Sequence, residues 1–238
     1  MPAFAGAVAL GYRYVETDVH VTSDGILVAF HDDKLDRVTT HQGLIRERTW
    51  REVAEARVDG IEPVLRFDDL LTTFPLLRVN VDPKHASSVD PLIHMIETLG
   101  AIDRICIGSF SDSRIARCRE ALGPALCTSL GPRAVTRLRS ASLRLPGGSF
   151  DAGCVQVPPS IGAVPLVDAA FVEASHVRGM QVHVWTIDDP GEMRALLDLG
   201  VDGIMTDQPA VLKDVLISTN RWHDPSTIGR DHLEVEDD

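Results

Sequence analysis

Short apolar segments alternate with longer amphipathic segments along almost the whole chain, and this alternation limits the possible folds more than any other feature. The apolar segments have strand length, and the intervening segments carry apolar residues at helical spacing. Repetition of this order predicts βα units around a parallel sheet. Seven strands are expected at residues 12–19, 76–83, 104–109, 125–129, 153–157, 181–186 and 202–206, with an extra short strand at residues 26–30 beside the first.

The last unit has the clearest local signals. Asp189 suits an N-cap, Pro190 suits the first helical position, and Gly200 suits the helix end. The next strand ends in a Thr-Asp-Gln-Pro turn at residues 206–209, which again predicts a strand followed by a helix.

One domain is expected, because 238 residues with 44% hydrophobic composition can bury one substantial core. We predict that residues 1–216 form this domain. Residues 217–238 are polar and end in an acidic run, which is typical of a disordered tail. For Trp222 the sequence leaves two alternatives open, local docking of the tail or no structural role.

Charge and cysteine content restrict the partners and the compartment. A net charge of −12 with scattered basic residues repels nucleic acid. No apolar run approaches the roughly 20 residues that cross a bilayer, so no stable membrane insertion is expected. The four cysteines lack C-x-x-C spacing, which favours free thiols and a cytoplasmic location; they are Cys106, Cys118, Cys127 and Cys154.

Acidic residues gather at the ends of two predicted strands. Alternate residues of a strand share a face, so Glu16 and Asp18 project together, as do Asn80, Asp82 and Lys84. Three converging carboxylates need a cation, and oxygen ligands suit Ca²⁺ or Mg²⁺, while the lysine suits a phosphate. The alternative is an edge strand with solvated acids.

A histidine follows the short strand at residues 26–30. His31 precedes Asp32, and an imidazole beside a carboxylate at a strand end can act as a general acid or base. A structural role is the alternative. His20 is expected at the rim of the sheet, and His183 is expected to pack in the core.

These residues belong to a longer series of short motifs in a fixed order. The motifs are Gly11–Val19, Thr22–Gly25, Val28–Asp32 and Leu35–Thr39, followed downstream by Val79–Lys84, Gly108–Phe110, Val184–Thr186 and Gly200–Pro209. Any one of the motifs alone is weak, whereas their common order and spacing are specific. From residue 1 to about residue 215 the pattern resembles the glycerophosphodiester phosphodiesterase family.

The resemblance implies a small phosphodiester substrate and a divalent cation, Ca²⁺ or Mg²⁺, that binds the phosphate oxygens. It also implies roles for individual side chains. Core packing is the alternative for both aromatic residues. By motif, the metal ligands are Glu16, Asp18 and Asp82, the catalytic residues are His31 and Lys84, and the substrate contacts are Lys84, Phe110 and Trp185.

Two departures from the family pattern change these expectations. Asp82 stands where the family usually has glutamate, so its shorter side chain has to reach the cation through water or a shifted backbone. Residues 1–10 resemble only the interior of the family's first helix. The resemblance therefore implies a TIM (β/α)₈ barrel that lacks the first strand, the first catalytic histidine and part of the first helix, in a natural protein that begins roughly 25 to 30 residues, or one βα unit, earlier.

The expected activity is hydrolysis of glycerophosphodiesters to glycerol 3-phosphate and an alcohol, as part of lipid metabolism. One alternative is an inactive barrel that retains metal or phosphate binding, because one histidine is missing. Another metal-dependent barrel, such as a phospholipase D-like toxin, is a further alternative. Unpaired strand edges at the gap would also favour association into an oligomer.

Overall fold

The computed structural model describes residues 1–223. Residues 224–238 lie outside this range, and with them most of the segment predicted to be a disordered tail. Seven parallel strands follow one another in sequence order, as predicted. The ladders join β1 to β6, β7 and β8 in one sheet and β9 to β12 and β13 in another, and a parallel bridge between Ser129 and Cys154 connects the two. The strands are β1 (Tyr14–Val21), β6 (Arg78–Pro83), β7 (Ile105–Ile107), β8 (Cys127–Thr128), β9 (Cys154–Val157), β12 (Gln181–Val184) and β13 (Gly203–Ile204).

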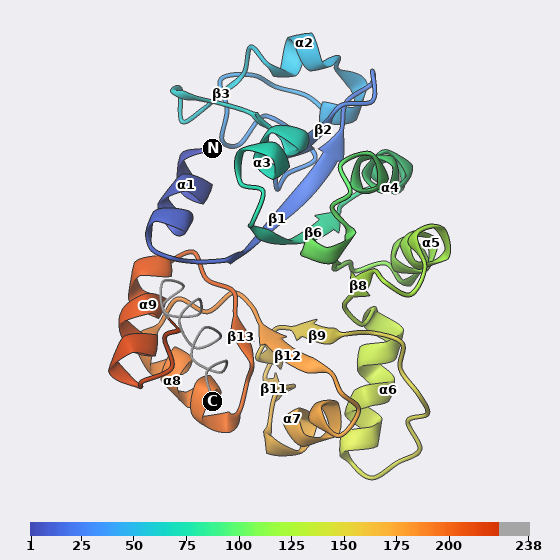
Figure 1. Cartoon of the computed structure of the whole chain (residues 1–238), viewed down its shortest axis with the longest axis vertical. Coiled ribbons are helices and arrows are strands. Elements are labelled where there is room, and N and C mark those ends of the chain that lie inside the picture. The colour runs from blue at the N-terminus through green and yellow to red at the C-terminus, as the bar shows by residue number, and fades with distance from the viewer. Residues whose placement is uncertain (224–238) are drawn as a thin grey trace, which may run out of the picture.

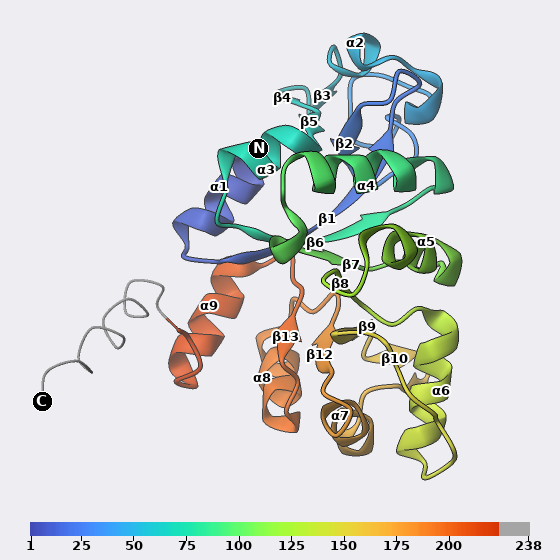
Figure 2. The same cartoon turned by 45° about the vertical axis from the view of Figure 1, so that its right-hand side comes forward.

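Helices separate these strands along the chain and lie around their outside (Figures 1 and 2). The Asp189 carboxylate accepts backbone N–H groups at the start of α8, and Gly200 ends that helix with φ 98°, as expected. The helices are α1 (Pro2–Ala9), α3 (Phe67–Thr73), α4 (Val89–Thr98), α5 (Asp112–Leu122), α6 (Pro132–Ser142), α7 (Ala169–His176), α8 (Pro190–Leu199) and α9 (Pro209–Ser218), with short 3₁₀ turns η2 (Ala86–Ser88) and η3 (Ile102–Arg104).

Strand residues that point outward form two hydrophobic cores under the helices. Val79 and Val81 of β6 pack in the first core, with α3 and α4. Val182 and Val184 of β12 pack in the second core, with α7 and α8. The alternate residues of each strand therefore face the opposite side, which is the interior of the strand bundle.

Residues 27–66 form a cap at the end of β1 (Figure 1, top). The extra strand β2 (Leu27–Ala29) runs antiparallel to β1, as part of the expected pair, and β5 (Leu65–Arg66) extends it. Phe30, Leu35 and Ile45 belong to a small third core of this cap. Its other elements are η1 (Ile45–Glu47), α2 (Trp50–Val53), β3 (Arg57–Val58) and β4 (Glu62–Pro63); a separate hairpin is formed by β10 (Ser160–Ile161) and β11 (Val164–Pro165).

The first and last elements of the described chain are in contact. The Tyr12 hydroxyl donates to the carbonyl of Pro209 at 2.7 Å, and the Lys213 ammonium donates to the carbonyl of Leu10 at 2.7 Å. Trp222 packs edge-on against Tyr12 with 5.2 Å between ring centroids, so of the two alternatives for this residue the structure shows docking. No helix within residues 1–223 is both long enough and apolar enough to cross a membrane.

Candidate active site

Acidic side chains meet where β1 and β6 run side by side. In the parallel register Glu16 pairs with Asn80 and Asp18 pairs with Asp82. Val15 packs against the outer core, so Glu16 and Asp18 face the interior, as strand parity predicted. Asp82 lies near the carboxyl end of β6, and the cluster therefore sits at the end of the strands where enzymes of this architecture bind substrates.

Lys84 connects two of the carboxylates. Its Nζ atom lies 2.7 Å from Asp18 Oδ1 and 3.2 Å from Asp82 Oδ2. Both aspartates are buried, with 8% and 7% exposure. Burial raises the pKa of Asp18, although Lys84 opposes that shift. Desolvation alone would lower the pKa of Lys84, but the two carboxylates outweigh it and raise this pKa. The ammonium thus neutralises part of an acidic cluster.

Glu16 lies in the most acidic surroundings of the site. Its side chain faces the interior of the strand bundle and is exposed to solvent. Desolvation, followed in size by repulsion from Asp18, raises the pKa of Glu16 to about 8. Asp82 and Asp207 add to the repulsion, and Lys84 opposes it. The charges in the site are therefore not balanced by the protein alone.

The carboxylates of Glu16, Asp18 and Asp82 offer oxygen ligands that suit a hard divalent cation, but their spacing would have to change to bind one. Asp82 Oδ1 is buried without a hydrogen-bond partner, which leaves one ligand lone pair free beside Asp18. However, the carboxylate oxygens of Glu16, Asp18 and Asp82 do not all lie within 4.8 Å of one another. Within residues 1–223 the side chains that meet this spacing are three cysteines. A cation bound by all three would require Lys84 to move from between the aspartates.

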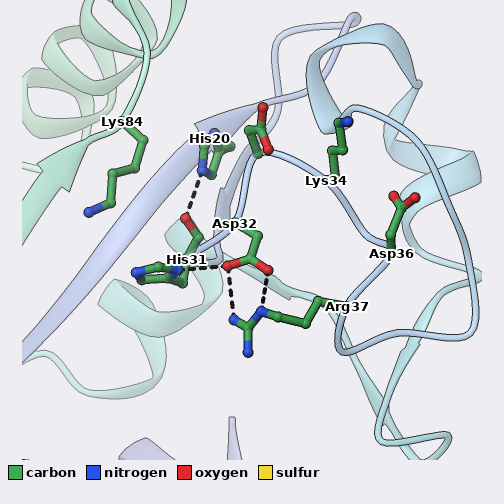
Figure 3. Close-up of a pocket in the computed structure, with 8 residues that line it drawn as sticks. His20, His31, Asp32, Lys34, Asp36, Arg37 and Lys84 are labelled. Atoms are coloured by element: carbon green, nitrogen blue, oxygen red, sulfur yellow. Dashed lines mark hydrogen bonds and ion pairs between the residues drawn. The ribbon is translucent and has the colours of Figure 1, made fainter.

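The cap places a histidine in a cleft of about 510 Å³, and Lys84 of the acidic cluster also lines this cleft. The His31 side chain is 72% exposed, and its Nδ1 atom lies 2.7 Å from Asp32 Oδ1. Figure 3 shows Arg37 clamping Asp32 with two hydrogen bonds, of 2.6 and 2.9 Å. This bidentate contact and the bond from His31 hold the pKa of Asp32 well below its usual range. The Nδ1 atom of His31 is thus held by Asp32, while the Nε2 atom remains available to a ligand in the cleft.

His20 lies deeper than its predicted place at the rim. It is 6% exposed, and its Nε2 atom lies 3.2 Å from the carbonyl of His31 (Figure 3). Burial lowers the pKa of His20, so its neutral form is favoured. The cap explains the difference, because β2 and the chain after it cover the end of β1. His20 therefore supports the backbone that carries His31.

The two predicted aromatic contacts lie against each other. The ring centroids of Phe110 and Trp185 are 5.6 Å apart, with the planes at 78°. Phe110 is 66% exposed, so it does not pack in the core. The pair offers an apolar surface at the carboxyl ends of β7 and β12.

Other polar residues contribute to the site without having been identified as site residues from the sequence. Asp207, in the turn between β13 and α9, adds to the repulsion that raises the pKa of Glu16. Arg114 of α5 donates to the backbone carbonyl of Lys84 at 2.6 Å and to Ser109 Oγ at 3.0 Å. Asp207 stood in a recognised strand-to-helix turn, which was the available signal for it. Arg114 had none, because its role depends on the packing of α5.

The sequence model of the Glycerophosphoryl diester phosphodiesterase family matches residues 1–211. The chain belongs to this family. It is 40% identical over 230 residues to the "Probable glycerophosphodiester phosphodiesterase 2" of Mycobacterium tuberculosis, covering 93% of this chain and 86% of that protein. The glycerophosphodiester phosphodiesterase of Caldanaerobacter subterraneus is 26% identical, with 88% of each chain covered. The predicted family and its phosphoric diester hydrolase class are therefore confirmed.

Solved structures of the family share the fold. A putative family member from Silicibacter pomeroyi superposes with a TM-score of 0.75 at 21% identity, covering 91% of this chain and 87% of that chain. A phosphodiesterase from Oleispira antarctica, solved with the product sn-glycerol-3-phosphate, superposes with a TM-score of 0.73 at 21% identity, covering 90% and 88%. The predicted α/β fold of the TIM-barrel type is confirmed by this likeness and by the seven parallel strands.

Proposed function

We propose that this chain hydrolyses glycerophosphodiesters to glycerol 3-phosphate and an alcohol. Membership of the family supports the reaction class. The main structural support is the cluster of Asp18, Asp82 and Lys84 near the carboxyl ends of β1 and β6. One buried oxygen of Asp82 in this cluster has no hydrogen-bond partner. A phosphodiester brings negative charge, and this cluster has the groups that could bind it together with a cation.

Glu16, Asp18 and Asp82 would hold a divalent cation, Ca²⁺ or Mg²⁺. Such an ion supplies Lewis-acid stabilisation of charge on the phosphoryl oxygens when it is bound. Lys84 is then free to leave the aspartates and donate to a phosphate oxygen as a point charge. Desolvation, and next repulsion from Asp18, raise the pKa of Glu16. The repulsion supports this assignment, because a bound cation relieves repulsion between carboxylates.

His31 would exchange a proton with an oxygen of the substrate. Its exposed ring lines the cleft beside Lys84, and Asp32 holds the Nδ1 side of the ring, so Nε2 is the atom available for transfer. Phe110 and Trp185 would border the glycerol portion and exclude water from one side of the site.

The test is an assay of the native chain with glycerophosphocholine, following release of glycerol 3-phosphate. We expect activity that a chelator abolishes and that Mg²⁺ or Ca²⁺ restores. Glu16→Gln, Asp18→Asn and His31→Ala should each lower kcat by roughly 100-fold or more. Glu47→Gln, an exposed acid of the cap, is the matched control and should keep full activity.

Two results would overturn the proposal. Unchanged activity in Glu16→Gln and His31→Ala would remove the site from the reaction. A chain that binds the cation by calorimetry but releases no glycerol 3-phosphate would instead be a binding protein with this fold, which was the alternative expected from the sequence.

The location and the assembly of the chain belong to the same proposal. All four cysteines are free thiols, which supports a reducing compartment such as the cytoplasm. Cell fractionation tests the location, and light scattering of the purified chain tests whether it forms an oligomer.

A further inference from the structure

Three cysteines lie together on three neighbouring strands, β7, β8 and β9. Cys106 and Cys127 are register partners on β7 and β8. Cys127 and Cys154 are the first residues of β8 and β9, which places them at the amino ends of these strands. Cys106 is the register partner of Asn80 on β6, two residues before Asp82, so the cluster lies deeper in the strand bundle than the carboxyl ends where substrate sites of this architecture lie.

The three thiols face the interior of the bundle. Ile105 and Ile107 flank Cys106 and pack in the outer core, as does Leu126 before Cys127. Val155 after Cys154 packs in the second outer core. Because side chains alternate along a strand, all three cysteines point to the other face.

The sulfur atoms have the spacing of a ligand set. The Sγ atoms of Cys106, Cys127 and Cys154 all lie within 4.8 Å of one another, and no other such trio of histidine, cysteine and acidic residues occurs within residues 1–223. The distance from Cys106 Sγ to Cys154 Sγ is 3.7 Å, and none of the cysteines is in a disulfide. A metal–sulfur bond is about 2.3 Å long, so shifts of the sulfur atoms by up to about 1 Å would let one ion bind all three.

One of the three sulfurs is open to solvent. Cysteine binds a metal as the thiolate, so binding releases a proton to water from each thiol. Cys154 is 2% exposed, but Cys127 is exposed to solvent, so an ion can enter at Cys127 and reach the buried sulfurs.

We propose that Cys106, Cys127 and Cys154 form a second metal site, which binds one thiophilic ion of the Cu⁺ or Zn²⁺ class. Thiolate sulfur selects these ions over Mg²⁺ and Ca²⁺, which prefer oxygen. Three sulfurs complete a trigonal set for Cu⁺, whereas Zn²⁺ takes a fourth ligand, such as water. The bound ion connects three consecutive strands through their side chains, so it stabilises the middle of the sheet.

Spectroscopy of the reduced native chain, kept free of oxygen, tests the site with Co²⁺ as the probe. We expect the sulfur-to-cobalt charge-transfer absorption to saturate at one Co²⁺ per chain; any Co²⁺ held by the carboxylates of the candidate active site does not give this absorption. Titration with Zn²⁺ or with Cu⁺ should then remove this absorption, and competition with a chelator selective for each ion shows which of them binds more tightly.

Serine variants test the ligands. Cys106→Ser, Cys127→Ser and Cys154→Ser should each weaken binding by more than the roughly 10–100-fold that loss of an outer-sphere partner causes. The matched control is Cys118→Ser. Cys118 lies on α5 and is buried in the first hydrophobic core, outside the strand bundle, so this variant should leave the absorption unchanged. The carboxylate variant Glu16→Gln should also leave it unchanged, which separates this site from the candidate active site.

A second measurement needs no variant. Alkylation of the native chain followed by mass spectrometry should modify Cys127 without the ion and leave it protected with the ion. The proposal is overturned if no charge-transfer absorption appears, if Cys118→Ser lowers it as much as the other variants, or if the ion leaves the alkylation of Cys127 unchanged. Formation of a Cys106–Cys154 disulfide on treatment with an oxidant, with no ion bound by the reduced chain, would also overturn it in favour of a redox pair.

Discussion

Lys84 determines how much negative charge the interior of the site can hold. Its ammonium lies between Asp18 and Asp82, both buried, and it is itself only 26% exposed. Lys84→Met keeps the stem and removes the charge, which leaves two carboxylates facing each other. We expect the free energy of unfolding in urea to fall by about 1–3 kcal/mol, less than the loss for a fully buried pair because part of the ammonium is solvated.

The same variant separates the charge of Lys84 from its packing. Adding Mg²⁺ or Ca²⁺ should raise the melting temperature of Lys84→Met by more than that of the native chain, because the cation would replace the missing positive charge. Lys34→Met is the control, since Lys34 lines the same cleft, and its effect should stay within about 0.5 kcal/mol. Equal losses in the two variants would contradict the role of Lys84.

Asp32 is a positioning residue for His31. It bonds one ring nitrogen and is itself clamped by Arg37, so Asp32→Asn removes the negative charge and one of the two oxygens that hold His31 and Arg37. We expect kcat for glycerophosphocholine to fall by roughly 10–100-fold with little change in KM, because ring orientation affects proton transfer more than binding. Asp33→Asn, which changes another acid of the cleft, should retain kcat. A rise in KM alone would indicate a substrate contact instead.

Helix ends set the backbone conformations that individual glycines must adopt. Gly200 ends α8 at φ 98°, whereas Gly6 lies inside α1, and a Cβ at Gly6 would meet no atom within 4 Å. Gly200→Ala should therefore destabilise the chain by about 1–2 kcal/mol, and Gly6→Ala should stabilise it by about 0.5–1 kcal/mol. Chemical denaturation of both variants tests the opposite signs, and the same sign in both would refute the argument.

Elements with a strong local pattern were predictable, and those defined by their neighbours were not. The strands at residues 12–19 and 76–83 have enough alternating residues to be located within about two positions of β1 and β6. β3, β4 and β5 of the cap have two residues each and exist through antiparallel pairing, which the sequence does not display. The same limit applies to the site: strand parity grouped Glu16 with Asp18, but it could not bring Arg114 of α5 to Lys84.

The whole molecule brings together segments from opposite ends of the described chain. Tyr12, just before β1, donates to Pro209 at the start of α9, and its ring supports Trp222. Lys213 contacts both Leu10 and the Trp222 ring, 5.0 Å from its centroid. These contacts tie α9 to the start of β1, so the first and last parts of the fold are expected to unfold together.

Tyr12 gives this connection a pH dependence. Burial, and next the charge of Asp214, raise the pKa of Tyr12 from its ordinary value near 10 to about 12. The neutral phenol is thus favoured by the fold. The stability that it contributes is fully present below pH of about 10 and is lost as the pH rises through about 12, by on the order of 1 kcal/mol once the partial exposure of the ring is taken into account.

The chain has two tyrosines, so ultraviolet absorption of the phenolate can follow each one in turn. In Tyr14→Phe, only Tyr12 remains, and its titration should be centred at about 12. Tyr12→Phe should lose that phase and should show a smaller decrease in stability between pH 10 and 12 than the native chain. A Tyr14→Phe titration centred near 10 would mean that Tyr12 is open to solvent, and hence that α9 does not hold the start of β1 as the contact between Tyr12 and Pro209 requires.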